Sequence, residues 1–140
     1  MNKVQSQNVS STASISMAAS VEALNGDQSF ILSNNESFLR RRNLVVKHLN
    51  ETPGLSCRTP EGAFYVFASC KGVLGKTTES GKKLLTDGDF MDYLLEEVGV
   101  AGVQGSAFGL EGFFRISYAT SDSILEDACQ RIKTACSKLS

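Results

Sequence analysis

The chain has 140 residues, of which 41% are apolar and 21% charged, and its formal net charge is −1. This balance is typical of one folded domain, or a large piece of one, rather than of a disordered chain. Without a basic excess, it argues against a protein that binds nucleic acid. No apolar run is long enough to span a membrane, and residues 1–20 contain no signal-peptide core. We therefore expect a cytoplasmic protein without a nucleic-acid or membrane partner.

The first part of the chain is expected to be mostly helical. Residues 1–10 are polar and predict an extended or loosely ordered segment. A helix is expected over residues 11–24, ended by Asn25-Gly26, because apolar residues recur there at helical spacing. A longer helix is expected over residues 27–50, ended by Pro53-Gly54. Its basic run, residues 40–42, favours a solvated helix face.

A β-rich stretch follows, centred on the turn at residues 60–62. Residues 63–67 are aromatic and apolar and predict a strand buried on both faces. Residues 71–86 contain three glycines and many polar residues, which indicates a surface loop. Thr86 and Asp89 have the spacing of a capping box, so a third helix is expected from there to Gly99.

The last forty residues predict two strands and a helix. Residues 100–105 (VAGVQG) predict a short strand, and a glycine-rich turn at residues 106–112 leads into the strand FFRISY. A final helix is expected from Ser121. Its apolar face is expected to hold one stripe, Ile124, Ala128, Ile132 and Ala135, with Leu125, Cys129, Cys136 and Leu139 beside it. The predicted fold is an α/β (α+β-like) layer, in which helices pack against a small mixed sheet.

Several motifs resemble catalytic or binding motifs but do not meet their requirements. The segment GVLGKTT (residues 72–78) lacks the first glycine and the leading strand of a phosphate-binding loop. His48, the one histidine, lies late in a helix and favours a partly exposed structural role. Glu61 and Glu111 have no partner carboxylate identifiable from the sequence. The four cysteines form no C-x-x-C pair and are expected to be reduced core residues.

Arg115 is the residue that most needs an explanation. It lies in an aromatic strand, and arginine is rarely fully buried unless it is paired. Its guanidinium matches a carboxylate at two points, and Phe108, Phe113 and Phe114 are candidate apolar walls around it. From the residues alone, a bound carboxylate and an internal ion pair with a glutamate such as Glu61 are about equally favoured.

Five segments together resemble one family: SQNVSSTASIS, RRNLVVKHLN, PEGAFYVFASCKG, YLLEEVGVAGVQGSAFG and FRISYATSDSILEDACQRI. They are similar to the C-terminal third of class I pyridoxal-phosphate-dependent aminotransferases, nearest to the bacterial aspartate and aspartate/prephenate subgroup. The resemblance implies the small domain of a fold-type I transferase. It implies that residues 1–26 end a large domain, 27–52 form a linking helix and 53–140 form the small domain. It also implies that Arg115 binds the substrate α-carboxylate.

The chain departs from this family in the residues that hold the cofactor. The family's Schiff-base lysine lies in a Ser-Lys stretch followed by G-x-R, and no lysine of this chain has those neighbours. The resemblance therefore implies pyridoxal 5'-phosphate in an intact enzyme, none bound to this chain alone, and no transamination by the chain itself. No catalytic, cofactor-binding or metal-binding residue is expected within it.

Three functions remain compatible with the sequence. The first is a C-terminal fragment of an aspartate aminotransferase-like enzyme, which transfers an amino group between an amino acid and a 2-oxo acid and is homodimeric when intact. The second is a non-catalytic binding module for amino or keto acids. The third is a chain that docks to a separate aminotransferase large domain.

Overall fold

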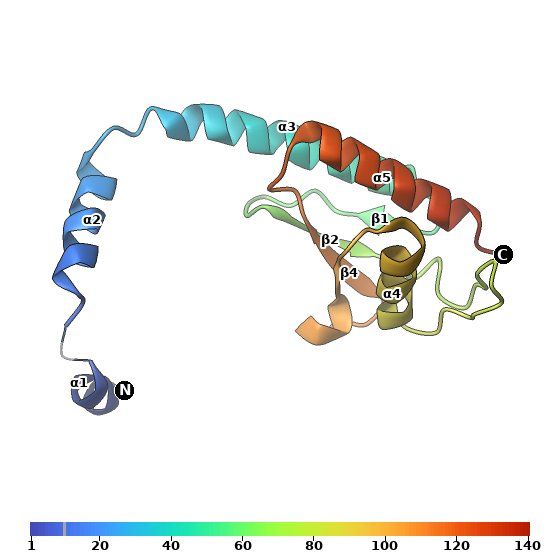
Figure 1. Ribbon diagram of the computed structural model, residues 1–140, viewed down its shortest axis with the longest axis horizontal. Helices are drawn as coiled ribbons and strands as arrows, with labels where there is room; N and C mark the ends of the chain where they lie inside the picture. Colours follow the sequence, from blue (N-terminus) through green and yellow to red (C-terminus); the bar gives the residue numbers. More distant parts are fainter. Residues whose placement is uncertain (10) are drawn as a thin grey trace. The chain divides into compact units, whose positions relative to one another are not determined.

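The computed structural model describes residues 1–9 and 11–140. These form two compact units, Met1–Asn34 and Asn35–Ser140; Figure 1 labels most of their elements. The first unit holds α1 (Asn2–Asn8), α2 (Ser14–Asn25) and the beginning of α3 (Phe30–Asn50). Within the described residues, none of the helices combines the length and the apolar character needed to cross a membrane.

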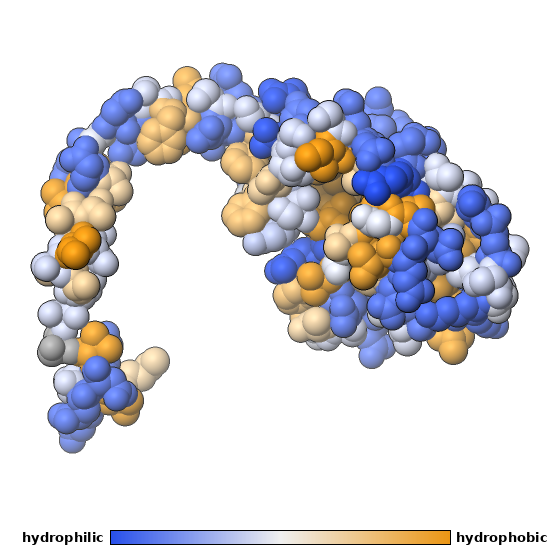
Figure 2. Space-filling model, in the orientation of Figure 1, coloured by the Kyte–Doolittle hydropathy of each residue, from blue (hydrophilic) through white to orange (hydrophobic). Residues whose placement is uncertain are grey.

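The helices of the first unit have no core of their own. Neither α1 nor α2 contains a buried residue, and Ile15, Val21 and Leu24 on α2 are each more than half exposed. Apolar residues appear in orange along this part of the chain in Figure 2. The predicted helix over residues 11–24 is confirmed as α2. The extended prediction is wrong over residues 2–8, which form α1, and Ser10 lies outside the described residues.

The second unit is built on a four-stranded sheet. Its strands are β1 (Ser56–Cys57), β2 (Tyr65–Ser69), β3 (Val103–Gln104) and β4 (Phe113–Ser117), in the spatial order β1-β2-β4-β3. Every pairing is antiparallel, so the expectation of a mixed sheet is wrong in that detail. Short connections join β1 to β2 and β3 to β4, and short connections produce antiparallel neighbours. The predicted α/β layer of helices on a small sheet is confirmed.

The two central strands have one buried and one partly exposed face. Val66 and Ala68 on β2 and Phe114 on β4 are fully buried, whereas their neighbours along each strand are partly exposed. The prediction that residues 63–67 are buried on both faces is therefore wrong, because core residues cover only one face and alternate side chains point away from it. We call the other side the open face; it carries Tyr65, Phe67, Phe113 and Arg115.

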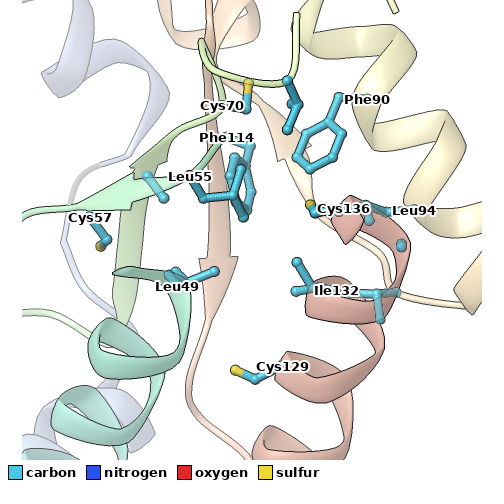
Figure 3. Packing of buried hydrophobic residues seen from close by; sticks show 14 of the residues in the cluster. Leu49, Leu55, Cys57, Cys70, Phe90, Leu94, Phe114, Cys129, Ile132 and Cys136 are labelled. Atoms are coloured by element: carbon cyan, nitrogen blue, oxygen red, sulfur yellow. The ribbon is translucent and has the colours of Figure 1, made fainter. Parts of the chain in front are cut away.

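The core fills the space between the buried face of the sheet and three helices: α3, α4 (Asp87–Val98) and α5 (Asp122–Ser137). Phe114 meets Phe90 edge to face, with ring centroids 5.5 Å apart, and Figure 3 shows both rings among core side chains from several elements. The hydroxyl of Tyr93 donates to the carbonyl oxygen of Ala135 at 3.0 Å, which joins α4 to α5. The core residues are Val45, Leu49, Val66, Ala68, Phe90, Leu94, Phe114, Leu125, Cys129, Ile132 and Cys136 with their neighbours.

The predicted caps of α4 and α5 are confirmed. Thr86 Oγ1 accepts the backbone N–H of Asp89, and the Asp89 carboxylate accepts the backbone N–H of Thr86, which completes a capping box. Gly99 ends α4 in the left-handed region at φ 64°, which glycine adopts without a steric penalty. Ser121 caps α5 by accepting the N–H of Ile124.

Two predictions about helix faces need correction. On α5 the buried residues are Leu125, Cys129, Ile132, Ala135 and Cys136, all of which the sequence predicts, but Ile124 is 55% exposed and does not belong to the buried face. Arg40 and Arg41 of the basic run both donate to the Asp122 carboxylate, at 2.6 and 2.9 Å, so they bind the start of α5 instead of facing only water. These hydrogen bonds hold the pKa of Asp122 below its usual value.

Replacing Thr86 by alanine removes the N-cap of α4. We expect a loss of about 1 kcal/mol in the free energy of unfolding, because one backbone N–H loses its acceptor. Urea titration followed by circular dichroism measures this as a lower midpoint with an unchanged m-value. Thr134→Ala, at an exposed position inside α5, is the matched control and should be neutral or slightly stabilising. An equal loss in both variants would contradict the capping role.

The four cysteines, Cys57, Cys70, Cys129 and Cys136, are free and buried, as predicted. Burial raises the pKa of Cys57, Cys70 and Cys129 to about 11 and that of Cys136 to about 12. Because a raised pKa keeps the thiol protonated, the reactive thiolate is scarcer at pH 8 than for an ordinary cysteine. We expect Ellman's reagent to modify these thiols slowly in buffer. In guanidinium at about 6 M, which unfolds most proteins, the reaction should be rapid. Rapid modification of the folded chain would show that the core opens easily.

Candidate carboxylate-binding site

The candidate site lies at Arg115, in the middle of β4. The antiparallel register pairs Arg115 with Phe67 on β2 and with Val103 on β3, so the residue has strands on both sides. An aromatic and β-branched sequence favours this strand, and two-residue alternation directs Arg115 away from the side occupied by Phe114. The fold therefore places a cation on the open face of the sheet, with its backbone fixed by pairing on both edges.

Two aromatic rings enclose the guanidinium. Its central carbon, Cζ, lies 4.5 Å from the ring centroid of Tyr65 and 4.6 Å from that of Phe108. Both distances are within the range of cation–π contact. Tyr65 lies on β2, and Phe108 belongs to the short 3₁₀ helix η1 (Gly105–Phe108), which precedes β4. Arg115 itself is partly buried, so the rings replace part of the water around its charge.

Among the described residues, no carboxylate forms an ion pair with Arg115. Glu61, the partner considered from the sequence, is exposed and lines a different hollow together with Arg42 and Phe64. Of the two explanations left open by the sequence, the internal ion pair with Glu61 is thus not formed. In the part of the chain that the structure describes, no acid pairs with the two parallel donors of the guanidinium.

A small open hollow of about 210 Å³ adjoins Arg115. Its lining residues are Tyr65, Ala101, Gly102, Val103, Arg115, Ile116 and Ser117. The lining contains one cation and no acid, and Tyr65 and Ser117 each carry a hydroxyl group. Such a surface is suited to an anion of a few atoms, because the guanidinium supplies two parallel donors and nothing in the lining repels negative charge.

The hollow does not have the groups needed to hold pyridoxal phosphate. None of its lining residues is a lysine, which a Schiff base requires, or an acid able to pair with a pyridine nitrogen. The lining of this hollow therefore does not fit pyridoxal phosphate. Among the described residues there is also no cluster of His, Cys, Asp and Glu suited to a metal ion.

The other candidates from the sequence have structural roles. Lys76, in the segment like a phosphate-binding loop, donates to the Leu139 carbonyl at 3.4 Å, and Thr77 exchanges backbone hydrogen bonds with Ser140. The segment is therefore tied to the C-terminus rather than shaped around a phosphate. His48 is partly exposed near the end of α3, as expected. Gly105 permits close packing against β4, since a Cβ there would lie 2.8 Å from the Cβ of Phe113.

The predicted aromatic walls are correct in part. Phe108 contacts the guanidinium, but Phe114 is on the opposite face, fully buried in the core. Phe113 is on the open face, where its ring stacks on Phe67 at 5.5 Å and not on Arg115. Tyr65 was missed by the sequence analysis. The register pairs Tyr65 with Ser117, two residues from Arg115, so its contact with the guanidinium is a diagonal one that only the paired sheet shows.

Comparison with known proteins gives the family. The family model described as aminotransferase class I and II matches residues 1–132. The chain is 61% identical over 140 residues to an aspartate aminotransferase of Rhizobium meliloti, covering all of this chain and 34% of that protein. It is 51% identical over 140 residues to an aspartate/prephenate aminotransferase of Cereibacter sphaeroides, covering all of this chain and 35% of that protein.

Solved structures agree with these matches. The crystal structure of the aspartate aminotransferase from Rhizobium meliloti superposes with a TM-score of 0.92 at 61% identity, covering 98% of this chain and 34% of that one. An aspartate aminotransferase from Thermotoga maritima gives a TM-score of 0.75 at 36% identity, covering 94% and 31% respectively. The chain thus spans about a third of the length of these relatives. With the family model matched over nearly its whole length, the chain belongs to the aminotransferase class I and II family.

Proposed function

We propose that this chain supplies the substrate-carboxylate site of an aspartate aminotransferase-like enzyme, and that Arg115 binds the α-carboxylate of the amino or keto acid. The observation that carries the proposal is the state of the Arg115 guanidinium. It is partly buried between Tyr65 and Phe108, beside an open hollow, and no carboxylate of the described chain pairs with it. A buried or half-buried cation without a partner costs free energy that a bound anion recovers.

The role follows from the chemistry of the two groups. A guanidinium donates two parallel N–H···O bonds to one carboxylate, which fixes both the position and the plane of the acid. The rings lower the local dielectric constant, so the attraction exceeds that of an exposed pair. An acid held in this way leaves its α-carbon substituents in a defined direction, which is the orientation that an amino-group transfer needs.

The proposal assigns the rest of the reaction to other parts of an intact enzyme. The family implies pyridoxal phosphate, which supplies the electron sink for the transfer when it is bound. In the proposed division, residues 1–26 end a large domain, residues 27–52 form a linking helix and residues 53–140 form the small domain. The substrates would be an amino acid such as aspartate and a 2-oxo acid, as the names of the relatives suggest.

The Arg115→Lys variant tests the carboxylate role. We expect kcat/KM to fall more than tenfold, a loss of at least about 1.4 kcal/mol, because an ammonium group lacks the planar two-point donor. The measurement uses the full-length Rhizobium meliloti aspartate aminotransferase with its matching segment replaced by this chain. Arg58→Lys, at an exposed arginine of the same domain, is the control and should stay close to the parent. If Arg115→Lys remains within about twofold of the parent, well under a tenfold effect, Arg115 is a structural residue.

A cofactor-labelling experiment tests the division of roles. We expect pyridoxal phosphate followed by borohydride to label the lysines of this isolated chain weakly and at several positions, because no lysine lies in the hollow at Arg115. Peptide mapping by mass spectrometry gives the label at each lysine, and the full-length Rhizobium meliloti enzyme is the positive control. One label per chain on a single lysine would contradict the proposal that the cofactor site lies outside these residues.

A further inference from the structure

Asp87 is a buried carboxylate to which the proposed function assigns no role. Asp87 is 3% exposed and lies in the first turn of α4. Its Oδ2 accepts the backbone N–H of Ser106 at 2.7 Å, and its Oδ1 accepts the backbone N–H of Gly88 at 3.2 Å. Ser106 is the second residue of η1. One buried carboxylate therefore stabilises the N-terminal ends of two helices, α4 and η1, where unpaired N–H groups carry partial positive charge.

This contact fixes η1 relative to the sheet. At its start, Gly105 packs against Phe113 so closely that a Cβ would lie 2.8 Å from the Cβ of that residue. At its end, Gly109 turns the chain in the left-handed region at φ 79° and donates its N–H to the carbonyls of Gly105 and Ser106. The four residues of η1 are thus held at both ends. Phe108 is the last of them, and its side chain lies over the open face.

Phe108 bridges the Arg115 site and the rest of the open face. Its ring centroid is 4.6 Å from Arg115 Cζ and 6.0 Å from the ring centroid of Phe67, which it meets at 83°. Tyr65 contacts the same guanidinium at 4.5 Å. An arginine side chain has several rotatable bonds, so two ring contacts restrict the directions in which its donors point.

We infer that Phe108 and Tyr65 act as a clamp that positions the Arg115 guanidinium before the substrate arrives, and that Asp87 holds the Phe108 side of this clamp in place through Ser106. The inference rests on the proposed function, since it explains how the same site achieves its affinity. It makes Phe108, Tyr65 and Asp87 positioning residues. Tyr65 also lines the hollow at Arg115, whereas Phe108 and Asp87 do not, so the tests below vary these two residues.

The clamp has a measurable consequence for binding. If the guanidinium is ordered in advance, less conformational entropy is lost when a carboxylate binds. Removing one ring should therefore weaken ground-state binding to substrates that share an α-carboxylate, with little effect on turnover. For the loss of one cation–π contact we expect KM to rise by roughly three- to tenfold, with kcat within about twofold.

The first test uses this chain and requires no activity. Phe108→Leu removes the ring but keeps apolar bulk, and Phe108→Tyr restores a ring at the same position. Protons of the Arg115 side chain, observed by NMR, should be shifted upfield by the ring currents in the parent and in Phe108→Tyr. The shift should be smaller in Phe108→Leu. Phe113→Leu, which removes a ring that stacks on Phe67 instead, is the matched control and should leave the Arg115 signals in place.

The second test measures KM and kcat in the full-length chimaera described above. Phe108→Leu should raise KM for both the amino acid and the 2-oxo acid, Phe108→Tyr should restore it, and Phe113→Leu should leave it unchanged. Asp87→Ala should move both the NMR signals and KM in the same direction as Phe108→Leu. If Asp87→Ala does not fold, the Phe108 variants still test the clamp. The role of Asp87 is then tested with Asp87→Asn, by the same NMR and KM measurements.

The outcomes separate this inference from the proposed function. Unchanged Arg115 signals in Phe108→Leu would overturn the clamp itself. If the Arg115 signals move in Phe108→Leu but KM does not change, the positioning role of the clamp is overturned. The carboxylate role of Arg115 would still stand in that case, provided that Arg115→Lys is impaired. If Arg115→Lys is fully active, the proposed function fails, and the NMR measurement still decides whether the two rings restrain the guanidinium.

Discussion

The antiparallel pairing of β2 with β4 is the constraint on which the rest of this structure depends. Its register aligns Phe67 with Arg115 and Ala68 with Phe114. A slip of one residue would exchange the two faces, so that Arg115 entered the core and Phe114 faced water. The buried side of the pairing is fixed by Phe114, which packs on Phe90 of α4. Packing of Phe114 in the core thus determines that the guanidinium of Arg115 lies on the open face of the sheet.

Arg115 is suited to binding because its surroundings satisfy it only in part. Two rings cover the faces of the guanidinium, but ring contacts do not replace hydrogen bonds to its donors. A charge-assisted pair with one carboxylate contributes about 1.5–3 kcal/mol, and the entropic cost of holding a small molecule offsets part of what its contacts contribute, so binding by this site alone is weak. A substrate bound tightly enough for turnover therefore needs further contacts. This agrees with a chain that spans about a third of the length of its relatives.

The sequence was sufficient to predict most of the elements and the caps, though not α1, and with the family resemblance it also indicated the residue at the centre of the candidate site. Thr86 with Asp89, Gly99 and Ser121 are local signals whose effect does not depend on distant residues, and each prediction was confirmed. The other errors concern faces and partners. Phe114 was assigned to the site although adjacent residues of a strand point to opposite faces. Tyr65 was overlooked because its place near Arg115 is set by the register of β2 and β4. Asp87 was missed because its acceptor role depends on Ser106, nineteen residues further along the chain.

The central claim is that the guanidinium of Arg115 is a carboxylate receptor, and a direct titration tests it. This chain, labelled with ¹⁵N, would be titrated with succinate while the Nε–Hε signals of its arginines are followed by NMR, with succinamide as the neutral control. The account predicts a saturable shift of the Arg115 signal in roughly the millimolar range, with the signal of Arg131, which is already bonded to Val98 and Asp127, unmoved. An Arg115 signal that does not respond, or that responds equally to succinamide, would contradict the claim.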